Sequence, residues 1–283
     1  SEGKLRLSYG RTGNNRVDDF AYMAANGLPA VLSYSFNNSY VASLIPGYNG
    51  STSSYSLGNA EVKWETTDQY NAGVDLGFLK DRISLTVDVY KKITKDLLLR
   101  ANLPYSSGYN MAYKNIGRVE NKGLEFSLNT TNIQNGVFKW TSSFNISFNR
   151  NKVLGLAENQ ETLLTSVNWD NGYTNTPAYI AKIGEPLGQM FGYIWEGVYQ
   201  LSDFDPTPSG GYKLKAGLAD NGNTNVQPGD IKYRDLNGDG TINASDNTVI
   251  GNSLPLHIGG FANNFSYKQF DLNVFFQWSY GND

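Results

Sequence analysis

Residues 235–246 read DLNGDGTINASD and carry oxygen-bearing side chains at the first, third, fifth and twelfth places, with a glycine at the sixth. Calcium takes six to eight oxygen ligands, and a glycine at the sixth place allows the chain to turn sharply around the ion. The spacing therefore predicts a calcium-binding loop, which departs from the EF-hand signature in having Asp rather than Glu at the last place. The predicted ligands are the side chains of Asp235, Asn237, Asp239 and Asp246, with the carbonyl of Thr241.

The sequence on either side of this loop indicates what a bound calcium would do. The flanks PGDIKYR and NTVIGNSLP are strand-like or turn-like, whereas a calcium sensor needs helices that move when the ion binds. No convergent set of acid and base residues accompanies the loop, so a catalytic calcium is not indicated. We therefore interpret the ion as a structural one that fixes a long loop. The alternative is an Asn/Gly/Asp turn without a metal.

The composition excludes several classes of function. The chain has 283 residues, no cysteine and one histidine, which rules out thiolate catalysis, disulfides and Cys/His zinc sites. A Ser-His-Asp triad would need His257, which follows Leu254-Pro255 where a strand is expected to begin and is typical of an ordinary strand-end residue. The net charge of −3 gives no electrostatic reason to expect nucleic acid as a partner. We expect no enzyme activity.

The aromatic content points to one class of fold. Aromatic residues make up 13% of the chain and charged residues 17%, whereas soluble domains average about 25% charged. Segments 138–148 and 270–280 alternate between apolar and polar residues, with Ser142 and Phe275 as the two exceptions, as strands do when one side faces lipid and the other a polar lumen. The residues that share the apolar side of these two segments are Phe138, Trp140, Phe144, Ile146 and Phe148, and Phe270, Leu272, Val274, Phe276, Trp278 and Tyr280.

The connections between the strand-like segments support the same class. Short turns at 80–82, 134–136 and 267–269 alternate with long segments rich in Gly, Ser, Asn and Tyr, as in outer-membrane barrels. Residues 1–283 are therefore predicted to be an all-β, antiparallel segment of a transmembrane β-barrel with about seven strands. Residues 154–255 are predicted to be one long extracellular excursion that carries the calcium loop, with 178–200 as a local hairpin or strand inside it. The predicted strands are 4–10, 65–79, 82–98, 116–133, 137–153, 256–267 and 270–280.

Several longer stretches, taken in this order and spacing, resemble the SusC-like TonB-dependent transporters. They are WETTDQYNAGVDLGFLKDRISLTVDVYKKITKDLLL, NIGRVENKGLEFSL, IGEPLGQMFGYIWEGVYQ, PGDIKYRDLNGDGTINASDNTVIGNSLP and the closing YKQFDLNVFFQWSYGND. Together they cover more than half of the chain.

The resemblance implies a location, a function and a set of partners. SusC-like proteins are outer-membrane barrels of about 22 strands with an N-terminal plug. They import glycans, or in some cases peptides, and pair with a SusD-like surface lipoprotein that acts as a lid, while TonB supplies the energy. Residues 1–283 would be a C-terminal part of such a barrel, in contact with membrane lipid. The plug and the TonB-contacting region would lie outside it, and seven strands would not close a barrel.

Four aromatic residues of the long loop are candidates for substrate binding, because sugar faces stack on aromatic rings: Trp169, Tyr173, Trp195 and Tyr199. The alternative is that such residues form an interfacial girdle or pack the loops. The competing function for the whole chain is a secreted, β-rich carbohydrate-binding module with a structural calcium. A β-rich hydrolase is disfavoured because no acid/base pair can be placed.

Overall fold

The computed structural model describes most of the chain as two compact units. The described residues are 2–15, 26–27, 33–36, 39–42, 45–46, 56–102, 111–156, 160–167, 176–208, 210–222 and 225–283. Unit 1 comprises Ser1–Thr162, Lys182–Pro186 and Leu256–Tyr280, and unit 2 comprises Leu163–Ala181, Leu187–Pro255 and Gly281–Asp283. Within the described ranges, no helix has the length and apolar character needed to cross a bilayer.

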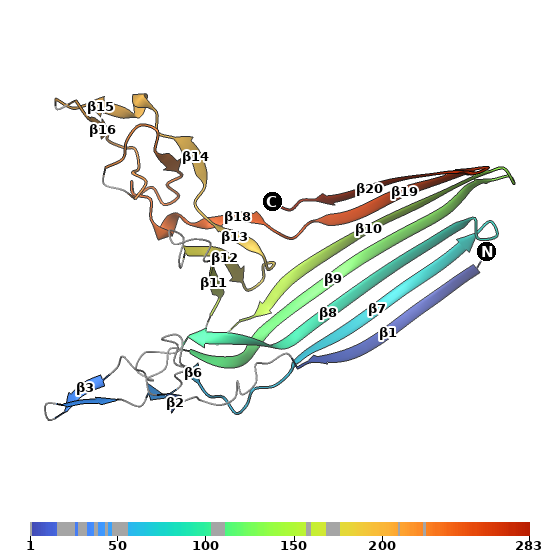
Figure 1. Ribbon diagram of the computed structural model, residues 1–283, viewed down its shortest axis with the longest axis horizontal. Coiled ribbons are helices and arrows are strands. Elements are labelled where there is room, and N and C mark those ends of the chain that lie inside the picture. Colours follow the sequence, from blue (N-terminus) through green and yellow to red (C-terminus); the bar gives the residue numbers. More distant parts are fainter. Residues whose placement is uncertain are drawn as a thin grey trace. The chain divides into compact units, whose positions relative to one another are not determined.

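Unit 1 is built on seven long strands in one twisted sheet (Figure 1). Each strand pairs antiparallel with its neighbour in the order β1-β7-β8-β9-β10-β19-β20, and the short β6 (Ser56–Leu57) adds parallel to β9. The predicted all-β, antiparallel class with about seven strands is confirmed, and the sheet is not closed into a barrel. The long strands are β1 (Glu2–Asn14), β7 (Glu65–Phe78), β8 (Ile83–Asn102), β9 (Met111–Gln134), β10 (Phe138–Gly155), β19 (His257–Tyr267) and β20 (Phe270–Tyr280).

The alternation in the sequence gives this sheet one apolar and one polar face. Because the strands are in register, residues of like parity fall into rows that cross all the strands. One such row runs Leu5, Val74, Val87, Phe126, Ile146, Gly259 and Trp278. The next residue along each strand points to the opposite side, and that row begins with Arg6, Gly73, Asp88 and Glu125. We call the two sides the apolar face and the polar face.

Short turns join neighbouring strands at one end of the sheet, which we call the short-turn end. Residues 79–82 join β7 to β8, residues 135–137 join β9 to β10, and residues 268–269 join β19 to β20. Gly136 has a φ of 69° and Lys268 a φ of 55°, the left-handed geometry that tight hairpins require. The opposite end, which we call the long-loop end, carries the long connections. Strands β8 and β9 extend further toward it than predicted, with 20 and 24 residues.

The remaining short strands form small sheets of their own. One of them has four strands in the order β11 (Thr162–Val167), β12 (Thr176–Lys182), β13 (Gln189–Gly192) and β18 (Thr248–Asn252). The β12–β13 pair is the hairpin expected within 178–200. Tyr199, Phe204 and Val226 form the core of unit 2, with Leu214 packed against them. The other pairs are β14 (Trp195–Val198) with β17 (Ile231–Tyr233), β15 (Phe204–Pro206) with β16 (Tyr212–Leu214), β2 (Asn26–Gly27) with β5 (Ile45–Pro46), and β3 (Ser33–Phe36) with β4 (Ser39–Ala42).

Candidate functional site

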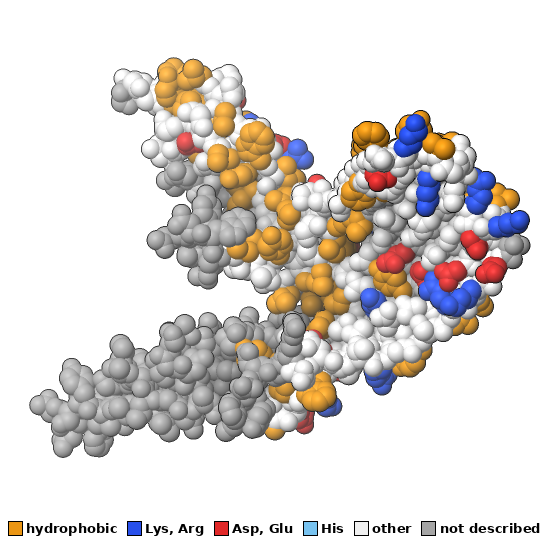
Figure 2. Space-filling model, turned by 45° about the vertical axis from the view of Figure 1, so that its right-hand side comes forward, with side chains coloured by type: hydrophobic (Ala, Val, Ile, Leu, Met, Phe, Trp, Pro, Cys, Tyr) orange, Lys and Arg blue, Asp and Glu red, His pale blue; other side chains and the backbone are white. Residues whose placement is uncertain are grey.

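A charged network on the polar face ties three strands together. The Arg6 guanidinium of β1 donates from Nε and Nη2 to both carboxylate oxygens of Asp75 on β7, at 2.8 and 3.0 Å. Its Nη2 also donates to Asp88 on β8 at 3.0 Å, and the Thr86 hydroxyl donates to Asp75 at 3.0 Å. Figure 2 shows acidic and basic side chains next to one another over the sheet. Two carboxylates shared by one guanidinium leave a net negative group on this face.

Neutral polar side chains continue the network across the middle of the sheet. The Tyr90 hydroxyl of β8 reaches past β9 to donate to Asn149 on β10 at 3.1 Å. It can do so because Gly123 lies directly opposite Tyr90, and a Cβ at Gly123 would lie 2.6 Å from the Tyr90 hydroxyl oxygen. Asn151 donates to Asn121 at 2.8 Å. The polar face is thus a fixed array of donors and acceptors suited to hydrogen-bonding solutes such as sugars or peptide groups.

The predicted calcium loop has an ordered set of side-chain-to-backbone hydrogen bonds. Asp235 accepts from the backbone N–H of Gly238 and of Gly240, at 2.6 and 2.8 Å. Asn237 accepts from the N–H of Asp239 at 2.9 Å. Each acidic or amide side chain therefore stabilises the turn that follows it.

Asp246 closes the loop from within. It is fully buried, and its two carboxylate oxygens accept from the backbone N–H groups of Leu236 and Asn243, both at 2.9 Å. The bonds from Asn243 and Leu236 lower the pKa of the Asp246 carboxyl against the opposing effect of burial. Asp246 is therefore ionised at neutral pH and fixes both ends of the loop.

The fit of this loop to a calcium ion can be judged from the same geometry. The predicted ligands lie in one compact loop, with the carboxylates of Asp235 and Asp246 directed at backbone N–H groups. Across the part of the chain that the structure describes, no group of three or more His, Cys, Asp or Glu side chains is placed so that it could hold a metal. The side chains therefore do not form a preassembled carboxylate cage, and calcium binding stays a prediction.

The aromatic candidates differ in their surroundings. Trp195 on β14 is 69% exposed, so its ring is open to a ligand. Tyr199 is 1% exposed in the core of unit 2, where its hydroxyl donates to the Ala219 carbonyl at 2.6 Å. Burial, with the nearby carboxylates of unit 2, raises the pKa of Tyr199 and keeps this donor protonated. Its burial favours the packing alternative over sugar stacking, and Trp169 and Tyr173 lie outside the described residues.

The sequence reasoning did not single out the Arg6 network, although one signal for it exists. Asp75 and Asp88 lie on the two strands of one hairpin, so the short turn at 79–82 fixes how they are placed. Strands β1 and β7 are separated in sequence by residues 15–64. The sequence of that connection does not predict the register that places Arg6 beside Asp75.

Comparison with known proteins identifies the family to which this sheet belongs. A family model described as "TonB dependent receptor-like, beta-barrel" matches residues 2–282. The chain belongs to this family. Its members are outer-membrane proteins.

Individual relatives that match nearly all of this chain belong to the same family. TonB-dependent receptor P39 of Formosa agariphila is 36% identical over 99% of this chain and 27% of its own length. TonB-dependent receptor SusC of Bacteroides thetaiotaomicron is 30% identical over 100% of this chain and 25% of its own length. The structure of the RagAB peptide importer in the open-open state shares the fold, with a TM-score of 0.70, 24% identity, and coverage of 100% of this chain and 26% of that one. The chain thus spans about a quarter of the length of the relatives it matches.

Proposed function

We propose that this chain is part of the barrel wall of an outer-membrane transporter that imports glycans or peptides with energy from TonB. The observation that carries the proposal is the two-faced sheet. Its apolar side includes Leu7 and Phe276, 74% and 59% exposed, and its opposite side carries the Arg6 network. Large exposed apolar surface is costly in water and stable in lipid, while fixed donors and acceptors suit a polar passage. The similarity to SusC and to the RagAB fold supports transport of either substrate class.

We also propose a SusD-like surface lipoprotein as the partner at the long-loop end. The support is the similarity to SusC, together with the concentration of long connections at that end of the sheet. The exposed Trp195 is a candidate contact for this partner or for the substrate.

The test uses the whole receptor that contains this segment, affinity-tagged in its native host. We expect a surface lipoprotein to copurify with it, and deletion of the receptor to abolish uptake of a fluorescent oligosaccharide or a fluorescent oligopeptide. Which of the two is lost identifies the substrate class. Unchanged uptake of both, together with a receptor that purifies without a lipoprotein, would contradict the proposal.

A second measurement separates this proposal from a secreted carbohydrate-binding module. Residues 1–283 expressed alone should aggregate or require detergent, because the apolar face would meet water and strands β1 and β20 have unpaired edges. A detergent-free monomer that unfolds cooperatively would favour the secreted module.

A structural calcium at residues 235–246 remains part of the proposed function. The ligand spacing supports it, and each loop carboxylate oxygen that accepts one N–H keeps a second lone pair. We expect one site of weak, extracellular-type affinity, with Kd on the order of 10⁻⁴–10⁻³ M. The comparison is between the parent receptor and an Asp235→Ala/Asp239→Ala variant, by isothermal titration and by hydrogen exchange of the loop. If hydrogen exchange of the loop in the parent receptor is the same with calcium and with a chelator, the ion does not order the loop.

A further inference from the structure

The apolar face ends abruptly toward the long-loop end of the sheet. Three successive rows on this face are apolar across strands β1 to β10, and the last of them runs Leu7, Ala72, Val89, Leu124 and Phe148. Two residues further along each strand, the next row on the same face consists mostly of charged side chains. That row runs Tyr9, Tyr70, Lys91, Lys122 and Arg150, and the one after it Arg11, Asp68, Ile93, Glu120 and Lys152. We call these two rows the charged belt.

The charged belt has an excess of positive charge. It contains five basic and two acidic side chains, and Lys91, Lys122 and Arg150 lie directly opposite one another on adjacent strands. Like charges placed directly opposite repel and destabilise the sheet. This arrangement is therefore expected to attract an anion that the belt does not supply itself.

The two carboxylates of the charged belt neutralise one side of it. Asp68 binds Arg11 at 2.6 Å and Lys95, which lies just beyond the belt, at 3.0 Å. Glu120 binds Lys91 at 2.9 Å. Both acids are largely buried, with side chains 5% and 13% exposed, and Glu120 also lies opposite Lys152 without an ion pair to it, so two carboxylates face five basic side chains of the belt.

Three cations on β9 and β10 are left over. Lys122, Arg150 and Lys152 are all exposed. Among the described residues, neither lysine has a carboxylate at ion-pair distance. Within the described part of the chain, the Arg150 guanidinium donates to two backbone carbonyls, those of Asn149 and Leu256, at 3.0 and 2.8 Å. These three side chains, which we call the free cations, can be neutralised by an external anion.

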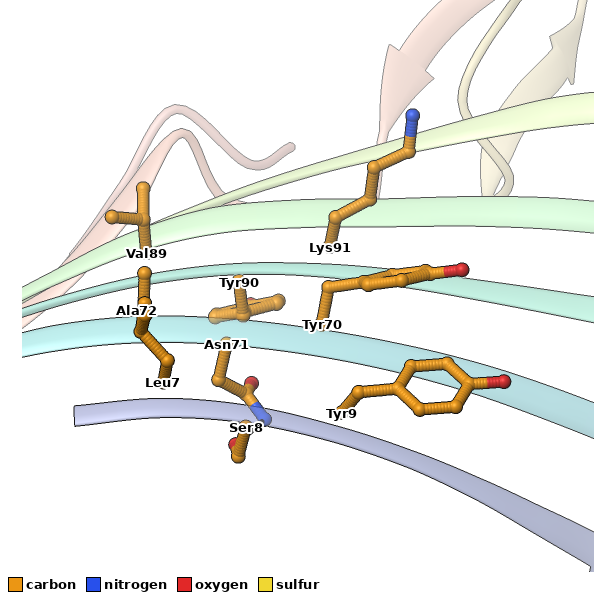
Figure 3. Close-up of a pocket in the computed structure, with 9 residues that line it drawn as sticks. All are labelled: Leu7, Ser8, Tyr9, Tyr70, Asn71, Ala72, Val89, Tyr90 and Lys91. Atoms are coloured by element: carbon orange, nitrogen blue, oxygen red, sulfur yellow. Dashed lines mark hydrogen bonds between the residues drawn. The ribbon is translucent and has the colours of Figure 1, made fainter.

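An apolar hollow lies directly beside the belt. It has a volume of about 550 Å³, and Leu7, Ala72 and Val89 line it from three strands (Figure 3). The rings of Tyr9 and Tyr70 lie next to one another along it, with centroids 5.0 Å apart, and Lys91 stands at its rim. The row that follows the apolar rows carries both tyrosines and cations, so acyl chains on the apolar rows would end level with aromatic and cationic side chains, where the interface and the phosphate of a membrane lipid lie.

We propose that this face binds a phosphate-bearing lipid, with the acyl chains along the apolar rows and the phosphate at the free cations. Charge complementarity and continuity with the apolar face select this occupant over an acidic protein, which would leave the hollow unfilled. The inference rests on the apolar face meeting the membrane, as in the family, and is independent of which substrate the transporter carries.

The test measures lipid selectivity in the whole receptor, purified in a non-ionic detergent. Native mass spectrometry counts bound phosphatidic acid and, separately, phosphatidylcholine with the same acyl chains, each with and without millimolar inorganic phosphate. We expect a clear preference for phosphatidic acid that inorganic phosphate alone does not compete away, since the acyl chains contribute. Full competition by inorganic phosphate would assign the site to a free anion and overturn the lipid proposal.

The variant Lys122→Gln/Arg150→Gln/Lys152→Gln removes the free cations. We expect the preference for phosphatidic acid to fall by about fivefold for each cation removed. A matched control, Lys80→Gln/Lys139→Gln/Lys268→Gln, removes the same charge at the short-turn end and should leave the preference unchanged. If the triple variant fails to fold, Lys152→Gln alone, at an exposed side chain, takes its place. We then expect about a fivefold loss of the preference for phosphatidic acid. A parent without preference, or equal losses in variant and control, would refute the proposal; loss of uptake with intact lipid preference would concern the transport proposal instead.

Discussion

Removing one oxygen atom from the core of unit 2 should loosen that unit measurably. The Tyr199 hydroxyl is the polar group at the centre of the Tyr199, Phe204 and Val226 cluster, and it donates to the Ala219 carbonyl at 2.6 Å. Tyr199→Phe keeps the ring and its packing but deprives the carbonyl of this donor. Loss of a partner for a buried polar group costs about 1–3 kcal/mol, and the value should lie toward the lower end because Ala219 is only half-buried.

Hydrogen exchange in the whole receptor measures this effect. The Tyr199 amide donates to Asp230 and the Gly229 amide donates to Tyr199, both at 2.9 Å, so both report on opening of the core. A loss of about 1–2 kcal/mol should speed their exchange roughly 5- to 30-fold. Tyr212→Phe removes the same atom from a ring that is 44% exposed, where water can replace the contact, and should leave exchange unchanged.

Two outcomes would refute this reasoning. Equal exchange in Tyr199→Phe and the parent would mean that the hydroxyl contributes nothing net to the core. Equal acceleration by Tyr199→Phe and Tyr212→Phe would mean that the effect does not depend on burial. Either result would reopen Tyr199 as a residue whose ring can turn outward to a substrate.

Two further perturbations probe the loop and the polar face. Because bonds from Asn243 and Leu236 lower the pKa of Asp246 in the folded loop, its stabilising contribution is fully present above the ordinary Asp pKa of about 3.9 and is lost as the pH falls below it. Exchange of residues 235–246, corrected for intrinsic rates, should therefore rise below about pH 4, and Asp246→Asn should show faster exchange at neutral pH without this acid step; an acid step that persists in Asp246→Asn would contradict the assignment. On the polar face, Arg6→Gln leaves two carboxylates facing each other without their shared cation, so we expect a lower melting temperature of the receptor, most at low salt. A control Lys139→Gln, at an exposed side chain of β10 away from this network, should melt as the parent does, and an unchanged melting temperature in Arg6→Gln would show that the network adds nothing to stability.

The sheet could be predicted from the sequence because its determinants are local. Alternation in 138–148 and 270–280 fixes which side chains share a face, and tight turns such as the one at Gly136 fix the pairing of neighbouring strands. The ends of β8 and β9 were less predictable. The strands predicted at 82–98 and 116–133 leave 99–115 as a connection rich in Ser, Asn and Tyr, whereas residues 98–102 of β8 still pair with residues 111–115 of β9.

The contacts that lie far apart in sequence could not be predicted in this way. The Arg6–Asp88 bond joins residues 82 positions apart, and the burial of Tyr199 depends on Val226, which approaches from a later part of the loop. Neither the strand period of two residues nor the helix period of 3.6 residues predicts such a contact, because the intervening chain sets no register. The residue type alone therefore does not predict that Tyr199 is buried and Trp195 is exposed.

The acidic loop shows why spacing predicts ligand types more readily than ligand geometry. An ion and a backbone N–H group both seek the same carboxylate oxygens, so a sequence that suits calcium also suits a turn closed by side-chain acceptors. In this loop Asp235 and Asp246 each accept two N–H groups, which orders the turn by hydrogen bonds alone. Calcium would have to use the remaining lone pairs of these oxygens and would add to an order that already exists. The quantity that decides its role is therefore the difference in loop exchange with and without the ion, rather than the presence of the loop itself.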